Sequence, residues 1–145
     1  MPTQQTVAIA SDHAGFDLKS GLVSTLREQG HTVLDLGTDN ATDSVDYPDF
    51  GRAVAEVVES GRASMGVLVC GTGIGISIAA NRVPGCRAAV CHDVTTARLA
   101  RRHNDANVIA LGARVLGPAV AADCLEAFLE TPFEGGRHQR RIDKL

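Results

Sequence analysis

The chain has 145 residues, of which 44% are hydrophobic and 21% charged, and its formal net charge is -3. These values are typical of one globular domain over residues 1–145 and exclude a disordered or low-complexity chain. The acidic balance and the low aromatic content argue against a nucleic-acid partner. No apolar run approaches the ~20 residues of a membrane span and no signal pattern is present, so we expect a cytoplasmic protein without a membrane partner.

Strand-like and helix-like patterns alternate along the whole chain. Short apolar runs mark the strands, and apolar residues at i, i+3 and i+4 mark the helices, with proline near helix starts and glycine beyond helix ends. In chain order we predict strand 7–11, helix 15–29, strand 32–36, a helix between Pro48 and Gly61, strand 65–70, helix 74–81, strand 87–91, helix 94–102, strand 107–111 and a helix after Gly117-Pro118. Residues 132–145 are then a C-terminal tail.

This alternation predicts an α/β fold with a five-stranded parallel sheet, doubly wound, with helices on both faces. In such folds ligands bind outside the carboxyl ends of the strands. The residues that follow the predicted strands therefore share one edge of the sheet. They are Asp12 and His13, the run 70–75, His92 and Asp93, and Arg114.

The run Cys70-Gly71-Thr72-Gly73-Ile74-Gly75 places three glycines between a strand and a helix. Bare backbone amides there can approach an anion, although a tight strand-to-helix turn would need the same glycines. The run is not a P-loop, because it lacks GK[ST], and Ile76 replaces the third glycine of GxGxxG.

Cys70 is the last strand residue before those amides. A thiol beside a helix N-terminus can act as a base or nucleophile, but a buried cysteine that only packs is an equal alternative. Cys86, Cys91 and Cys124 lack such surroundings and are assigned to the core. Because the four cysteines form no CxxC pair and no Cys/His zinc spacing, we expect free thiols and no metal.

Two Asp-His pairs lie at strand ends. Asp12 and His13 could serve the cleft, although the simpler reading is a helix N-cap with its neighbour. Asp93, next to His92, has the same alternative and less support, because nothing else converges there.

Two further groups lie away from this edge. His103 and Asn104 precede the fifth strand, at the opposite edge of the sheet, so a catalytic His103 would have to come from a second subunit; the alternative is a cation that stabilises a helix end. Arg137 and Arg141, at i and i+4, would face the same way on a helical tail and could bind one phosphate, whereas Arg140 would point elsewhere. A solvated basic tail is the alternative.

Six ordered motifs together resemble one known family, the ribose-5-phosphate isomerase B and galactose-6-phosphate isomerase (RpiB/LacAB) group. The motifs are Ser11-Asp12-His13-Ala14-Gly15, Asp46-Tyr47-Pro48, the run from Cys70 to Asn81, Arg102-His103-Asn104-Asp105, Gly112-Ala113-Arg114 and Gly135-Gly136-Arg137-His138. The resemblance implies a three-layer Rossmann-like fold, no metal or other cofactor, and a homodimer or homotetramer whose active sites lie between subunits.

The resemblance further implies reversible isomerisation of ribose 5-phosphate to ribulose 5-phosphate through a cis-enediolate. Asp12 and the His103 of a second subunit resemble the groups that open the sugar ring, and Cys70 stands at the position of the C2 base. Thr72 and the amides from Gly71 to Gly75, including Gly73 and Ile74, would hold the enediolate oxygens together with Asn104. His13, Arg137 and Arg141 resemble the phosphate-binding residues, with Arg114 as a further contact. Tyr47 would line the sugar pocket or merely pack before Pro48.

Two other functions stay open on the sequence. The same chemistry could act on another phosphosugar, such as allose or galactose 6-phosphate or a tetrulose 4-phosphate. A non-catalytic nucleotide-binding module could also use the glycine-rich run to hold a phosphate.

Overall fold

The structure, a computed structural model, describes residues 3–145 as one α/β unit with eleven helices and strands. The order of elements confirms the predicted alternation. The elements are β1 (Thr6–Ser11), α1 (Phe16–Glu28), β2 (Thr32–Asp35), α2 (Tyr47–Glu59), β3 (Met65–Cys70), α3 (Ile74–Ala80), β4 (Ala88–Val90), α4 (Val94–Asn104), β5 (Val108–Gly112), α5 (Pro118–Glu130) and α6 (Arg137–Ile142).

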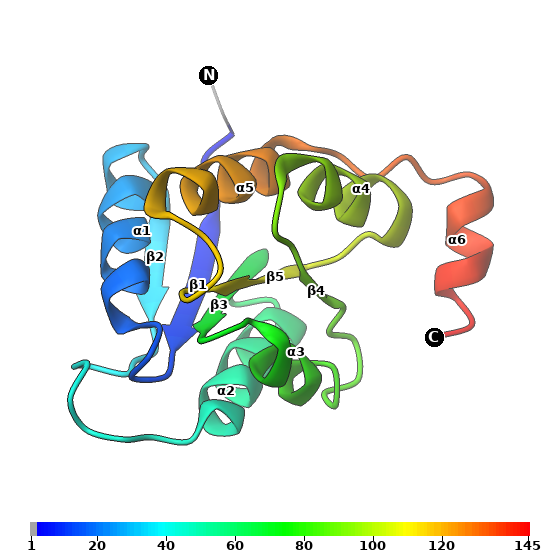
Figure 1. The fold of residues 1–145 in the computed structure, drawn as a ribbon. Helices are drawn as coiled ribbons and strands as arrows, with labels where there is room; N and C mark the ends of the chain where they lie inside the picture. Colours follow the sequence, from blue (N-terminus) through cyan, green and yellow to red (C-terminus); the bar gives the residue numbers. More distant parts are fainter. Residues whose placement is uncertain (1–2) are drawn as a thin grey trace.

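The five strands form one parallel sheet in the order β2-β1-β3-β5-β4. Helices α1, α4 and α5 cover one face and α2 and α3 cover the other, which makes three layers (Figure 1). The chain moves outward from β1 to β2 and then starts again on the other side of β1 with β3. The gap between β1 and β3 is therefore the point at which the winding direction switches, and ligands of doubly wound sheets bind at the carboxyl ends of the strands there.

The core is divided by the sheet into two apolar clusters. Alternate residues of each strand face opposite sides, so Val67 and Val69 pack toward α1, α4 and α5, whereas Leu68 and Cys70 pack toward α2 and α3. This alternation decides where the thiol points. The side chain of Cys70 enters the α2 and α3 side of the molecule, directly below the loop that leads into α3.

The predicted boundaries differ from the observed ones mainly at the strand and helix ends. The fourth strand contains only Ala88–Val90 rather than residues 87–91, and α4 continues to Asn104, two residues past the predicted end. Asp105 then ends this helix in a left-handed conformation, with φ of 45°. His103 and Asn104 consequently lie on the last helical turn rather than after it.

The C-terminal tail leaves α5, crosses the end of α4 and carries the short helix α6, which stands apart from the sheet (Figure 1). A buried arginine stabilises this crossing of the tail over α4. Arg101 is 7% exposed and its guanidinium donates to the carbonyl oxygens of Thr131 and Ala106 and to the carboxylate of Asp105. The basic end of α4 thus has a structural role, because Arg101 holds the tail and the segment before β5 against this helix. Among residues 3–145, no helix combines the length and the apolar character needed to cross a membrane.

Candidate active site

The loop after β1 brings a carboxylate and an imidazole to the switch point. Asp12 is 7% exposed, and its Oδ1 accepts a hydrogen bond from the amide of Gly15 at 3.1 Å. The N-cap of α1 is Gly15 and not Asp12, so the N-cap alternative is wrong. Because Oδ1 accepts the hydrogen bond from Gly15, Oδ2 of Asp12 is the oxygen available to a ligand. His13 is half-buried, and its Nδ1 accepts a hydrogen bond from the amide of Val45 at 3.2 Å. Because an amide can only donate, Nε2 of His13 is the nitrogen that carries the proton in this arrangement.

The loop after β3 closes around the thiol of Cys70. Cys70 is 5% exposed, and its sulfur accepts a hydrogen bond from the amide of Gly73 at 3.2 Å. Gly73 has φ of +80°, a left-handed conformation that a residue with a Cβ adopts only at a cost. The glycine therefore lets the chain turn back far enough for its amide to reach the sulfur.

A second amide of this loop is also used internally. The amide of Ile74 donates to the hydroxyl oxygen of Thr72 at 3.2 Å. Two of the amides expected to face an anion, those of Gly73 and Ile74, are therefore occupied in this structure. The Thr72 hydroxyl hydrogen stays free to be donated, and Thr72 is exposed.

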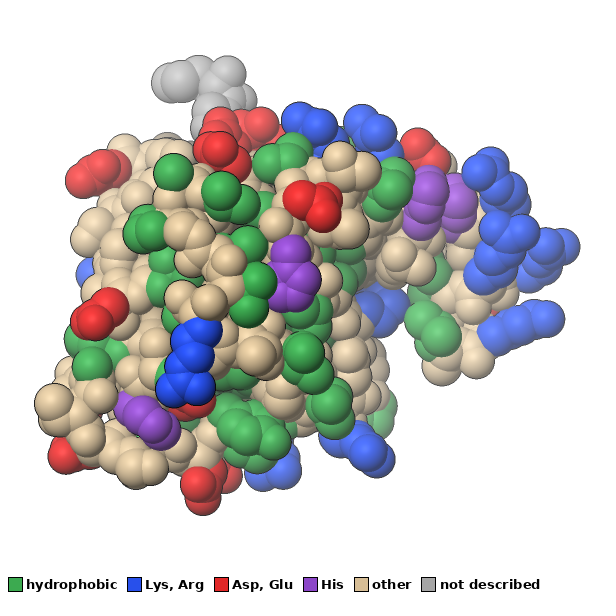
Figure 2. Space-filling view, viewed as in Figure 1, with side chains coloured by type: hydrophobic (Ala, Val, Ile, Leu, Met, Phe, Trp, Pro, Cys, Tyr) green, Lys and Arg blue, Asp and Glu red, His purple; other side chains and the backbone are tan. Residues whose placement is uncertain are grey.

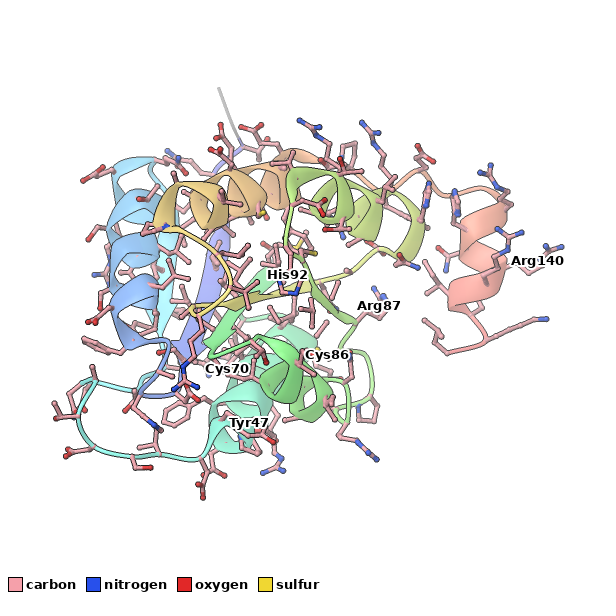
Figure 3. The ribbon with its side chains drawn as sticks, in the orientation of Figure 1. Tyr47, Cys70, Cys86, Arg87, His92 and Arg140 are labelled. Atoms are coloured by element: carbon pink, nitrogen blue, oxygen red, sulfur yellow. The ribbon has the colours of Figure 1, made fainter. Side chains whose placement is uncertain are left out.

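Tyr47 and Arg114 flank the same loop. A Cβ added to Gly75 would lie 2.5 Å from Cε1 of Tyr47, and one added to Gly71 would lie 3.4 Å from Nη1 of Arg114. The tyrosine ring and the guanidinium group thus lie against opposite ends of the glycine-rich run. Arg114 is further held by its amide, which donates to the carbonyl oxygen of Gly71 at 2.9 Å. Figure 3 shows Tyr47 beside the carboxyl end of β3, near Cys70.

The remaining predicted site residues form a second group at the other edge of the sheet. His103 and Asn104 end α4, before β5 begins, and Arg137 and Arg141 lie on α6. Cys70 pairs with Gly112 at the far end of β5, so the two groups are separated by a strand of five residues, about 16 Å at ~3.3 Å per residue. One chain does not bring them together.

Lys and Arg side chains gather over α6 at one side of the molecule (Figure 2). Arg137 and Arg141 are both exposed and are separated by one helical turn, as expected for a helical tail. Arg140 lies on the side of α6 that is turned away from the sheet (Figure 3). Asn104 lines a groove of about 720 Å³ between α6 and the segment that contains β4.

One cluster in this second group was missed by the sequence analysis. The imidazole rings of His103 and His138 stack with centroids 4.5 Å apart and planes 17° from parallel, and the carboxylate of Glu134 lies beside both. The spacing of Glu134 and His138 at i and i+4 was visible in the sequence. Their contact with His103 was not, because it depends on how the tail crosses α4.

The three side chains do not form a good metal site, although their ligand atoms lie within 4.8 Å of one another. A metal ion lies close to the plane of each imidazole that binds it. Two nearly parallel stacked rings cannot share one in-plane ion, so His103 and His138 would have to separate first.

The other polar candidates have structural partners. Asp93 is the N-cap of α4 and accepts a hydrogen bond from the amide of Thr96 at 2.6 Å, which confirms the helix N-cap alternative given for His92 and Asp93.

All four cysteines are buried and free. Burial raises the pKa of Cys86 to about 11, against a smaller opposing effect of Arg87. Burial likewise raises the pKa of Cys91 to about 11 and that of Cys124 in the same direction.

Comparison with known proteins places these residues in a family. Residues 7–145 match the family described as Ribose/Galactose Isomerase. Ribose-5-phosphate isomerase B of Escherichia coli is 45% identical over 96% of this chain and 93% of its own length. D-erythrulose-4-phosphate isomerase of Pectobacterium atrosepticum is 43% identical over 97% and 92%. The structure of ribose-5-phosphate isomerase B of Clostridium thermocellum superposes with a TM-score of 0.94 at 51% identity, over 96% of this chain and 93% of that one.

Proposed function

The chain belongs to the ribose/galactose isomerase family and is a sugar phosphate isomerase, and from this we propose that it interconverts ribose 5-phosphate and ribulose 5-phosphate with Cys70 as the base at C2. The observation that carries the proposal is the hydrogen bond from the Gly73 amide to the sulfur of Cys70. An amide donor stabilises negative charge on the sulfur, and a thiolate is the form of cysteine that can remove a proton.

Ring opening is the first step, because ribose 5-phosphate exists mainly as a closed furanose. In our proposal Asp12 accepts the proton of the O1 hydroxyl through its Oδ2, while His103 donates a proton to the ring oxygen as the C1–O4 bond breaks. The buried position of Asp12 supports this role, since the amide of Gly15 orients the carboxylate. Both atoms of the broken bond are then neutral, and the open aldehyde is ready for enolisation.

Enolisation follows on the open chain. Cys70 removes the proton from C2, which leaves an enediolate with its negative charge on O1. The proton of the O2 hydroxyl passes to O1, and Cys70 then returns a proton to C1 as O2 becomes the ketone oxygen. The Thr72 hydroxyl can donate to one of these oxygens. The amides of Gly71 and Gly75 are the further donors we assign, since those of Gly73 and Ile74 already bond within the loop. The side-chain amide of Asn104 would approach the same oxygens.

The phosphate and the rest of the sugar would be held by side chains around this loop and by the tail. His13 presents an Nε2–H donor because Val45 occupies its Nδ1. Arg114 adds a positive charge beside Gly71. Arg137 and Arg141 would bind the phosphate with charge-assisted hydrogen bonds, and Tyr47 would line the sugar pocket.

The assignment requires a second copy of the chain. His103, Asn104, Arg137 and Arg141 lie at the edge of the sheet opposite Cys70, so a complete site takes these four from one subunit and Cys70 from another. The groove of about 720 Å³ beside Asn104 leaves room for part of a neighbouring subunit between α6 and β4. A two-fold dimer, alone or paired into a tetramer, would then contain two equivalent sites.

A four-carbon substrate is the second candidate, because a relative of 43% identity is an erythrulose-4-phosphate isomerase. Six-carbon aldose phosphates follow from the same chemistry. A nucleotide-binding module without catalysis is set aside, because the relatives on which family membership rests are isomerases.

The test is a set of coupled assays of the purified protein with aldose and ketose phosphates of four, five and six carbons. We expect ribose 5-phosphate to have the highest kcat/KM. Ribose 5-phosphate deuterated at C2 should show a primary isotope effect, and the product should exchange hydrogen with solvent at C1. A higher kcat/KM for a four- or six-carbon sugar would replace the proposed substrate, and unchanged turnover of ribose 5-phosphate in Cys70→Ala would contradict the proposed base.

A further inference from the structure

His103 has an unusual neighbour for a side chain at the end of a surface helix. Its ring stacks on that of His138, with centroids 4.5 Å apart. The two rings differ in exposure: the side chain of His103 is 40% exposed, whereas that of His138 is 7% exposed. His138 is therefore the fixed partner, and His103 packs one face of its ring against it while part of its side chain stays exposed.

Glu134 completes the cluster from the segment that precedes α6. Its Oε1 lies 3.4 Å from Nε2 of His138 and 4.0 Å from Nε2 of His103. Its backbone amide donates to the carbonyl oxygen of Arg102 at 3.1 Å, which fixes the residue beside the last turn of α4. The carboxylate thus lies at the open edge of the stacked pair.

The Nε2 atom of His138 is fully buried and makes no hydrogen bond to any residue within 3–145. The charged group beside it is the carboxylate of Glu134. Such a buried polar atom is costly unless something compensates it. The Glu134 carboxylate can attract the Nε2–H group of each ring. It then offsets the cost of burying the Nε2 atom of His138 and orients the ring of His103.

We propose that His138 and Glu134 are positioning residues for His103, holding its imidazole in the orientation that ring opening needs. The proposal rests on the function proposed above, in which His103 is the acid of ring opening. His138 provides the flat surface that limits rotation of the His103 ring, and Glu134 selects which ring nitrogen carries the proton. All three belong to one chain, so they would enter a shared site as one preassembled unit.

The proposal predicts different effects on two kinds of substrate. Ribose 5-phosphate closes a furanose through O4 and must be opened. A four-carbon aldose 4-phosphate carries its phosphate on O4, so it cannot close that ring and needs no acid for opening. Both substrates need the phosphate-binding residues, Cys70 and the glycine-rich loop. Damage to α6 as a whole should therefore affect both, whereas loss of His103 orientation should affect only the five-carbon sugar.

The experiment measures kcat/KM of Glu134→Gln and His138→Ala on both substrates, with Glu130→Gln, an exposed carboxylate at the end of α5, as the matched control. We expect both variants to lose at least about tenfold on ribose 5-phosphate, since misplacing a catalytic group by about 1 Å can cost ~100-fold. On erythrose 4-phosphate they should change no more than the control does. His138→Phe, which keeps a flat ring, should recover much of the rate lost in His138→Ala.

The possible failures are distinguishable. His103→Ala, assayed in parallel, tests the ring-opening role itself: equal loss on both sugars, or on neither, would overturn that part of the proposed function. If His103→Ala is selective for ribose 5-phosphate while Glu134→Gln and His138→Phe both match the control, the positioning proposal is overturned. Equal losses on both sugars in Glu134→Gln would also overturn it, because they would indicate a structural role. Glu134 is exposed, so its variant tests the proposal even if His138→Ala does not fold.

Discussion

The amide of Gly73 donates a hydrogen bond to the sulfur of Cys70 across 3.2 Å, so the loop after β3 turns back on the residue that begins it. This contact needs the left-handed conformation of Gly73, with φ of +80°, and the orientation of Cys70 toward the α2 and α3 side of the sheet. It gives this buried thiol a donor that can support a negative charge. At the other three cysteines burial is the largest effect and raises the pKa, although Arg87 beside Cys86 and a hydrogen bond with Thr96 at Cys91 act in the opposite direction.

The first prediction concerns this thiol. Cys70→Ala should lower kcat for ribose 5-phosphate by about 1,000-fold or more, because general-base catalysis contributes ~100- to 10,000-fold. Binding of the sugar phosphate, measured by calorimetry, should change little, as should the circular dichroism spectrum. Cys124→Ala is the matched control and should keep wild-type turnover apart from a loss of stability. Wild-type turnover in Cys70→Ala would refute the assignment.

The second prediction concerns sharing of the site between subunits. Cys70→Ala and His103→Ala should each be inactive on ribose 5-phosphate, and mixing them with subunit exchange should restore about a quarter of wild-type activity, since half of the dimers are mixed and each contains one intact site. Activity is followed after brief exposure to denaturant and refolding together. If native mass spectrometry shows mixed dimers and no activity returns, the two residues do not act in one site across the interface.

The third prediction concerns α6. Arg137→Ala and Arg141→Ala should each lower kcat/KM about 10- to 100-fold, because a charge-assisted hydrogen bond contributes about 1.5 to 3 kcal/mol. The loss should appear in kcat as well as in KM, because binding of the remote phosphate also positions the reacting carbons. Arg140→Ala, on the side of the helix turned away from the sheet, is the control. Unchanged kcat/KM in both variants would mean that the phosphate is held elsewhere.

The fourth prediction is a pH dependence of thiol labelling. Burial raises the pKa values of Cys86 and Cys91 to about 11. At pH 8 each of these thiols is therefore ionised in only about one molecule in a thousand. Iodoacetamide should therefore label both slowly in the folded protein, and the rate should rise about tenfold per pH unit up to pH 11 while the fold persists. Peptide mass spectrometry measures each site, with the unfolded protein as reference. Fast labelling of Cys86 at pH 7 would contradict the raised pKa.

The layers of the fold and half of the candidate site were predictable from local sequence patterns. Alternating apolar runs and helical repeats depend on neighbours close in sequence, so they identified five strands and five helices to within a few residues. The carboxyl-end residues Asp12, Cys70 and Arg114 followed directly, because parallel strands place their ends at one edge. The same rule placed His103 at the opposite edge.

The internal bonding of the glycine-rich loop was decided by the three-dimensional structure. Glycines predicted that backbone amides could approach an anion, but composition does not say which amides stay free. Those of Gly73 and Ile74 bond to Cys70 and Thr72 because one left-handed residue redirects the chain, and a conformation of a single residue leaves no periodic signal.

The tail shows the same division between sequence and structure. The sequence by itself determined that Arg137 and Arg141 would lie on one side of any helix formed there, because 3.6 residues complete a turn. Only the tertiary structure decided that this helix returns to α4, where His138 stacks on His103 and Arg101 holds the carbonyl of Thr131. Those contacts join residues 35 and 30 positions apart. They depend on the crossing of two segments whose packing is set by the core beneath them, and no spacing along the chain encodes that crossing.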